Sequence, residues 1–156
     1  MRRGLFITFE GIDGAGKGTH VQSVREYYQA QGHEVVTTRE PGGTELGEKL
    51  RHILISDAMD YMSEVMLLMA GRNEHLAKVI RPALARGAVV ICERFTDSTL
   101  AFQCGGRGLD SRHILAAAAV VHGDLWPDLT LVFAVIFKRQ AAEKAAKAPP
   151  NYSQRY

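Results

Sequence analysis

Residues 5–19 read LFITFEGIDGAGKGT, which is an apolar run followed by a glycine-rich segment. The run Leu5–Glu10 predicts a buried strand, and good helix formers continue from the glycines to about Gln31. Strand, loop and helix in this order form the unit from which parallel α/β sheets are built. This stretch therefore indicates the fold class before any other part of the chain is considered.

The glycine-rich segment also has the spacing of a phosphate-binding loop. Gly11 and Gly16 stand five residues apart, and Lys17 follows directly. Glycines let successive backbone amides face phosphate oxygens, while the lysine and the helix N-terminus add positive charge. A tight turn with a surface lysine is the competing interpretation. We predict that the following residues bind ATP: Gly11, Ile12, Asp13, Gly14, Ala15, Gly16, Lys17, Gly18 and Thr19.

Strands and helices alternate along the rest of the chain. Further strands are predicted at Glu34–Thr38, Ala88–Cys92 and Asp128–Phe133. Helices are predicted at Leu46–Leu54, at Ser63–Arg86 with a bend or break at Pro82, and from the Asp110 cap through His122, after a polar loop at Gly105–Gly108. Apolar strands joined by helical crossovers predict a P-loop NTPase-type three-layer α/β sandwich, with a parallel sheet and helices on both faces. We expect residues 1–156 to form a single domain.

Composition narrows the possible partners. Of the 156 residues, 46% are hydrophobic and 23% charged, and the net charge of +2 indicates neither a nucleic-acid nor a membrane partner. Cys92 and Cys104 are too few, and too different in setting, for a disulfide framework or a zinc site. We therefore expect a cytoplasmic protein.

Three segments, in order, resemble bacterial thymidylate kinases: Phe9–Lys17, Thr38–Thr44, and Glu93–Thr99 running on to Gly108. The similarity extends from about residue 4 to residue 133. It implies a P-loop nucleoside monophosphate kinase that uses magnesium to transfer the terminal phosphoryl group of ATP to dTMP, in dTTP biosynthesis. It also suggests a homodimer.

The resemblance assigns roles around the acceptor phosphate and sugar. Asp13 corresponds to a carboxylate that contacts the acceptor sugar, Arg39 lies beside the acceptor, and Pro41 shapes its loop, often through a cis peptide bond. Arg94 follows the third strand, where a planar guanidinium can hold the acceptor phosphate by two parallel hydrogen bonds. We predict that Lys17, Arg94 and Asp13 are the catalytic residues. A turn-forming Asp13 and a surface Arg94 are the alternatives.

Other positions correspond to the base and sugar pocket. Arg72 corresponds to an arginine that bonds the thymine ring, although an arginine on a helix is more often exposed to solvent. Leu68 stands where the family commonly stacks a phenylalanine on the base. Thr99, Phe102 and Gln103 line the pocket by resemblance, and Phe102 could equally belong to the core.

The chain departs from the family pattern at several points. Gly18 replaces the hydroxyl residue that normally ligates magnesium, which leaves Thr19 as the nearest substitute, and Glu93 replaces the usual aspartate. No sequence that resembles the family's arginine-rich lid is found near Phe133–Val135. We therefore expect that the lid is missing there, and that the family's last strand and helix are missing after Tyr156. The phosphate loop of this chain contains no arginine. In family members with such a loop, the lid supplies the arginine. A kinase for another nucleoside monophosphate and a lidless nucleotide-binding protein with little catalysis are the remaining alternatives.

Overall fold

The computed structural model describes residues 3–134 of the chain. The expected loss of the lid near Phe133–Val135, and of the elements beyond Tyr156, concerns segments outside the described residues. Within residues 3–134, no helix is both long enough and apolar enough to cross a membrane.

Four strands form one parallel sheet in the order β2-β3-β1-β4. Their bounds are Phe6–Gly11 (β1), Val35–Arg39 (β2), Val89–Glu93 (β3) and Leu129–Phe133 (β4). In register, Phe6 of β1 pairs with Val90 of β3, and Ile7 pairs with Leu129 of β4. This arrangement confirms the predicted α/β class with a parallel sheet.

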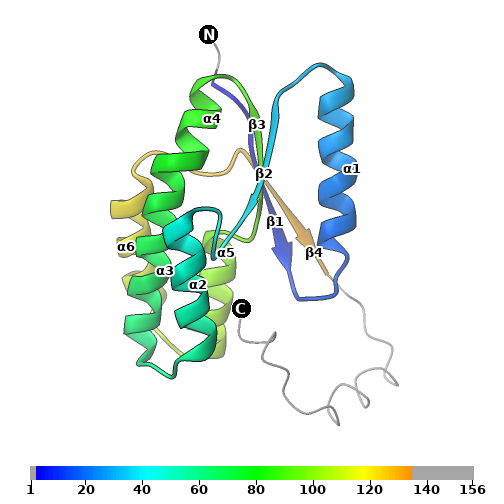
Figure 1. The fold of residues 1–156 in the computed structure, drawn as a ribbon. Helices are drawn as coiled ribbons and strands as arrows, with labels where there is room; N and C mark the ends of the chain where they lie inside the picture. Colours follow the sequence, from blue (N-terminus) through cyan, green and yellow to red (C-terminus); the bar gives the residue numbers. More distant parts are fainter. Residues whose placement is uncertain (1–2, 135–156) are drawn as a thin grey trace, which may run out of the picture.

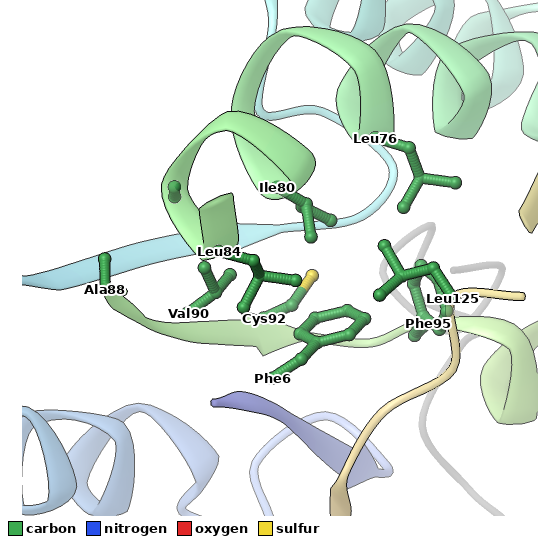
Figure 2. Packing of buried hydrophobic residues seen from close by; sticks show 10 residues of the cluster. Phe6, Leu76, Ile80, Leu84, Ala88, Val90, Cys92, Phe95 and Leu125 are labelled. Carbon is green, nitrogen blue, oxygen red and sulfur yellow. The ribbon is translucent and has the colours of Figure 1, made fainter. Parts of the chain in front are cut away.

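The two central strands are buried on both faces, which explains their continuous apolar sequence. Because side chains alternate along a strand, Phe6 and Val90 join a core cluster on one face, whereas Ile7 and Ile91 join a second cluster on the other. Figure 2 shows the first cluster, in which the Phe6 ring meets the side chains of the covering helical segment and of Cys92 on β3. Both faces of the two central strands are therefore covered, whereas the edge strands β2 and β4 keep exposed residues.

Helices cover the sheet unequally, as Figure 1 shows: α1 lies alone on one side, and the other helices lie on the opposite side. The α-helices span Lys17–Ala30 (α1), Glu45–Ser56 (α2), Tyr61–His75 (α3), Arg81–Ala85 (α4), Thr96–Thr99 (α5) and Ser111–His122 (α6). Two π-helical segments span Leu76–Ile80 (η1) and Leu100–Gly106 (η2). Asp110 caps α6 by accepting from the amide of Arg112, as the sequence predicts.

Two helical details differ from the predictions. The bend or break predicted at Pro82 takes the form of a π-helical segment, η1, directly before the proline, and α4 continues through it. A proline lacks the amide hydrogen and clashes with the carbonyl four residues earlier, and a widened π turn at that point relieves both problems. The second difference is that Thr96–Gly106 is helical, so the helical segment includes Gly105 and Gly106 of the predicted polar loop.

The topology places three loops at one edge of the sheet. The connection that leaves β1 runs to β2 on one side, while the chain after β3 returns to β4 on the other side of β1. The crevice at the carboxyl ends of β1 and β3 is therefore the topological switch point, where ligands bind in open α/β sheets.

Candidate functional site

The loop after β1 has the geometry of an anion site. Gly16 precedes α1 with φ of 85°, a left-handed conformation that glycine adopts without strain. Side-chain atoms built at Gly14, Gly16 and Gly18 would meet no atom of residues 3–134 within 4 Å, so the space before the loop is open. The first turn of α1, which lies within this described part, carries no acidic residue. The positive end of the helix is therefore available to an anion.

Lys17 lies beneath this loop and is buried. Its Nζ donates to the carbonyl oxygens of Gly11 at 3.0 Å and Ile12 at 2.9 Å, and stands 3.5 Å from Glu93 Oε1 at the end of β3. The ammonium group therefore lies between the phosphate loop and the neighbouring strand end. A phosphate group bound in the loop would compete with Glu93 for this charge.

Arg94 occupies a strained position directly after β3. Among residues 3–134 it is the one non-glycine residue with positive φ, at 67°. Its amide donates to Phe9 O at 2.9 Å, and its guanidinium donates to Asp13 Oδ1 at 2.7 Å and to Ser98 Oγ at 3.3 Å. The predicted catalytic pair Arg94 and Asp13 is thus joined by an ion pair. Strain held in place by such contacts is typical of functional positions.

Glu10, which was not predicted as a site residue, supports Arg94 from below. Its carboxylate accepts hydrogen bonds from the Phe95 amide at 2.8 Å and from Ser98 Oγ. Burial raises the pKa of Glu10 despite the opposing hydrogen bonds from Ser98 and Phe95. Ser98 therefore connects Glu10 to Arg94. The signal available in the sequence was a carboxylate at the end of an otherwise apolar strand.

Beside Arg94 lies a pocket that is partly open to solvent. It is lined by Glu40, Pro41, Leu68, Arg72, Arg94, Phe95, Ser98, Thr99, Phe102 and Gln103. The structure thus brings together all the predicted acceptor residues except Asp13 and Arg39. The Glu40–Pro41 peptide bond is cis, as the resemblance implied. Phe102 is half-buried, with its ring 5.3 Å from the Arg94 guanidinium, so it is not a plain core residue.

Arg72 forms the charged wall of this cavity and is buried, so the interpretation of a surface arginine is wrong. Its Nε donates to Glu40 Oε2 at 2.6 Å, and its two terminal nitrogens donate to Thr96 Oγ1 at 3.3 Å and Thr99 Oγ1 at 2.9 Å. The guanidinium carbon also lies 4.7 Å from the centre of the Phe95 ring. A guanidinium has five N–H donors, so these contacts orient it without using all of them.

Glu40 is the buried counterion of Arg72. Burial opposes its ionised form, but Arg72 and the side chain of His75 hold the pKa of Glu40 below its ordinary value. The His75 Nδ1 lies 3.0 Å from Glu40 Oε1. Glu40 was not predicted as a site residue, although its place between Arg39 and Pro41 in a quoted motif was a usable signal.

Arg39 lies outside this cavity. Its side chain is 55% exposed and pairs with Glu48 Oε2 at 3.0 Å. It lines a separate open cleft together with Glu93 and Thr38. Gln103 lines the cavity but already donates to Glu64 Oε1 at 3.1 Å. Arg39 and Asp13 therefore lie outside the lining of the cavity, and Asp13 reaches it through its ion pair with Arg94.

A magnesium ion at this edge of the sheet would be coordinated partly by protein side chains and partly by substrate phosphates. In the described part of the chain, no group of three or more His, Cys, Asp or Glu side chains could hold a metal ion alone. Magnesium normally keeps several waters and takes one or two carboxylates plus substrate phosphates. Glu93 is a half-exposed carboxylate beside Lys17, and Thr19 is exposed on the first turn of α1. These residues fit such an arrangement.

Comparisons with known proteins point to one family. The family model described as thymidylate kinase matches residues 9–155. Thymidylate kinase from Methylobacillus flagellatus is 52% identical over 153 residues, which are 98% of this chain and 75% of the relative. The Burkholderia mallei protein of the same name is also 52% identical, over 97% of this chain and 75% of its own length. A crystal structure of thymidylate kinase from Ehrlichia chaffeensis superimposes with a TM-score of 0.75 at 43% identity, over 84% of this chain and 75% of that one.

Proposed function

The chain belongs to the thymidylate kinase family, and we propose that it transfers the terminal phosphoryl group of ATP to dTMP, giving ADP and dTDP. One observation carries the proposal from the structure. A cavity lined by two buried arginines, Arg72 and Arg94, lies beside the phosphate loop, and the ion pair of Asp13 and Arg94 connects the cavity to the loop. This reaction would supply dTDP for dTTP synthesis.

ATP binds with its phosphates in the loop from Gly11 to Thr19. The backbone amides and the N-terminus of α1 face the phosphates, and Lys17 stabilises the charge that develops on the transferred group. This assignment is supported by the open space before the loop and by the burial of Lys17 next to it.

The acceptor nucleotide lies in the cavity with its base against Arg72 and its phosphate against Arg94. The remaining acceptor residues surround the base and sugar: Pro41, Leu68, Thr99, Phe102 and Gln103. Leu68 packs on the base in place of an aromatic ring. Asp13 orients the sugar, and Arg39 approaches the acceptor from the rim.

Chemistry at this site needs no protein base, because the attacking oxygen of dTMP is already an ionised phosphate oxygen. That oxygen forms a bond to the terminal phosphorus of ATP as the bond from this phosphorus to the bridging oxygen breaks, and the bridging oxygen leaves on ADP. The main contributions of the chain are alignment and charge: Arg94 holds the acceptor phosphate in line, and Lys17 faces the donor.

Magnesium would be held by Glu93 and Thr19 together with donor phosphates, and it neutralises phosphate charge when bound. The proposal includes a cytoplasmic homodimer that binds neither nucleic acid nor membranes, for which the family resemblance and the net charge of +2 are the support.

A substrate panel tests the proposal. The protein is incubated with Mg-ATP and each of dTMP, dUMP, AMP, CMP and GMP, and ADP release is followed. Turnover selective for dTMP is expected. Preference for AMP would indicate a different monophosphate kinase, and nucleotide binding without turnover would indicate a binding protein with little catalysis.

A further inference from the structure

His75 is a fully buried histidine that none of the proposed catalytic or binding roles uses. It ends α3, three residues after Arg72, so the two side chains project from the same side of the helix. Its Nδ1 lies 3.0 Å from Glu40 Oε1, and its Nε2 lies 2.6 Å from Thr38 Oγ1. It does not line the nucleotide cavity. The ring therefore connects the end of β2 to the buried carboxylate of Glu40, which lines the cavity.

The two carboxylate oxygens of Glu40 contact two different residues of α3, Arg72 and His75. Oε2 accepts from Arg72 Nε at 2.6 Å, and Oε1 faces His75. An ionised carboxylate can only accept, so Nδ1 of His75 carries the hydrogen and donates it. In neutral histidine, Nε2 then accepts from the hydroxyl of Thr38. Glu40 is thereby fixed from two sides, and a carboxylate fixed in this way determines where its arginine partner can lie.

The loop after β2 is built around the same ring. Gly43 has φ of 77°, and a Cβ atom there would lie 2.5 Å from His75 Nε2 and 2.7 Å from Thr38 Oγ1. The backbone thus approaches the imidazole too closely for any larger residue. His75 therefore supports the loop that carries the cis Glu40–Pro41 bond as well as the carboxylate itself.

We propose that His75 is a positioning residue for base recognition, which holds Glu40 and, through Glu40, sets the orientation of the Arg72 guanidinium at the cavity wall. The inference rests on the assignment of this cavity to dTMP under the proposed function. If the guanidinium tilts away from the base, binding of the acceptor dTMP weakens, whereas ATP binding at the phosphate loop does not change. The effect of losing His75 is therefore specific to dTMP.

Two substitutions separate positioning from packing. Asparagine at residue 75 places an amide nitrogen near the position of Nδ1 and keeps the contact to Glu40, whereas glutamine places its amide near Nε2 and keeps the contact to Thr38. Both remove the ring. We expect His75→Gln to raise the KM for dTMP about tenfold relative to His75→Asn, as loss of a hydrogen bond to a buried charge implies, with similar KM values for ATP. Equal KM values for dTMP in the two variants, or a matching rise for ATP, would overturn the proposal.

A double-mutant cycle tests the route through Arg72. If His75 acts on the base through Arg72, then His75→Gln costs much less dTMP affinity in an Arg72→Lys background than in the native protein. Additive losses would contradict this route. Isothermal titration with dTMP supplies the affinities, and thermal unfolding checks that each variant is folded.

The same titration separates the inference from the proposed function. A native protein that binds dTMP without phosphorylating it would refute the proposed activity and still report the effect of His75. A native protein that does not bind dTMP would refute the cavity assignment and the inference together.

Discussion

Arg94 combines a backbone conformation that disfavours side chains with a guanidinium that pairs with Asp13 of the phosphate loop and lines the neighbouring pocket. Its φ of 67° costs about 1–2 kcal/mol relative to a right-handed conformation, and its side chain is held by Asp13 and Ser98. A residue selected for stability alone would be glycine here. An arginine in a conformation that only glycine adopts without strain is consistent with the role proposed for Arg94.

Replacing the Arg94 side chain separates its effect on stability from its effect on activity. We predict that Arg94→Ala lowers kcat/KM for dTMP by about 100-fold or more, since one preorganised charge contact to the reacting group is lost. The free energy of unfolding should change by only about 1 kcal/mol, because Asp13 is half-exposed and water can solvate it. Urea unfolding of Arg94→Ala and Arg94→Gly provides the control: the glycine variant should be the more stable and equally inactive. Retained activity in either variant would remove Arg94 from the site.

Glu93 and Lys17 give a second prediction at this scale. The carboxylate of Glu93 reaches to 3.5 Å from Lys17 Nζ, and this contact competes with ATP phosphates. Glu93→Asp withdraws the carboxylate by one methylene, so we expect the KM for ATP to fall several-fold while the magnesium requirement is kept. Glu93→Gln is the matched control, since it also releases Lys17 but removes a proposed magnesium ligand. Identical magnesium dependence in the two variants would argue against that ligand role.

Sequence alone was sufficient for residues at strand ends and insufficient for buried partners. Lys17 and Arg94 follow predicted strands or loops in motifs with fixed spacing, so their places at the site follow from topology. The burial of Arg72 could not be predicted in the same way, because its counterion Glu40 lies 32 residues away in sequence. His75 was missed for the same reason, because its contacts with Glu40 and Thr38 join segments that are far apart in the sequence.

The loop from Arg39 to Gly43 shows how one element is held in place by another. At Gly43 both the left-handed φ of 77° and the short approach to His75 require glycine. Gly32 also has a left-handed φ, of 82°, but no described atom lies within 4 Å of a Cβ placed there. The two glycines therefore share a left-handed backbone conformation, but only Gly43 approaches a side chain of α3 closely.

This pair of glycines yields a prediction for the element. Both Gly32→Ala and Gly43→Ala should lose about 1 kcal/mol of stability from backbone strain. Gly43→Ala should lose about 1–3 kcal/mol more, because the methyl group displaces His75 or the loop. Urea unfolding of the two variants measures the difference, and only Gly43→Ala should raise the KM for dTMP. Equal stabilities would show that the loop moves away from His75 freely.

Helix boundaries were predictable where caps or glycines mark them, and less so where π turns occur. Asp110 and the end of α1 followed the expected rules. The segments η1 and η2 did not, since a widened turn keeps the apolar face of the helix and leaves hydrophobic periodicity almost unchanged. Pro82 was a correct signal of irregularity, but the irregularity lies just before the proline.

At the scale of the whole molecule, His122 lies where three parts of the fold meet. It ends α6, its ring stacks on Phe95 after β3 at 4.9 Å, and it meets the Trp126 ring edge-on at 4.8 Å in the connection to β4. Its Nε2 lies 3.2 Å from Thr96 Oγ1. Within residues 3–134, its Nδ1 has no hydrogen-bond partner. A protonated ring would therefore place a poorly compensated charge in the core.

Because His122 takes up a proton more readily in the unfolded chain than in the folded one, it should make the fold less stable in acid. Burial, and then the charge of Arg72, lower the pKa of His122 from 6.5 to about 4, with Arg81 adding to the effect and Glu40 opposing it. The unfolded chain then binds a proton from pH 6.5 downward while the folded chain does not, so stability falls as pH drops from 6.5 to about 4.

The expected loss is about 2 kcal/mol between pH 7 and pH 5. Urea unfolding over this range measures it, and His122→Phe is the control because it keeps the stacking and cannot titrate. Glu40 does not confuse the result: its pKa is lowered, so the stability it contributes is present above about 4.5 and is lost only below the tested range. If the native protein and His122→Phe lose the same stability between pH 7 and pH 5, the buried ring is not the group that titrates.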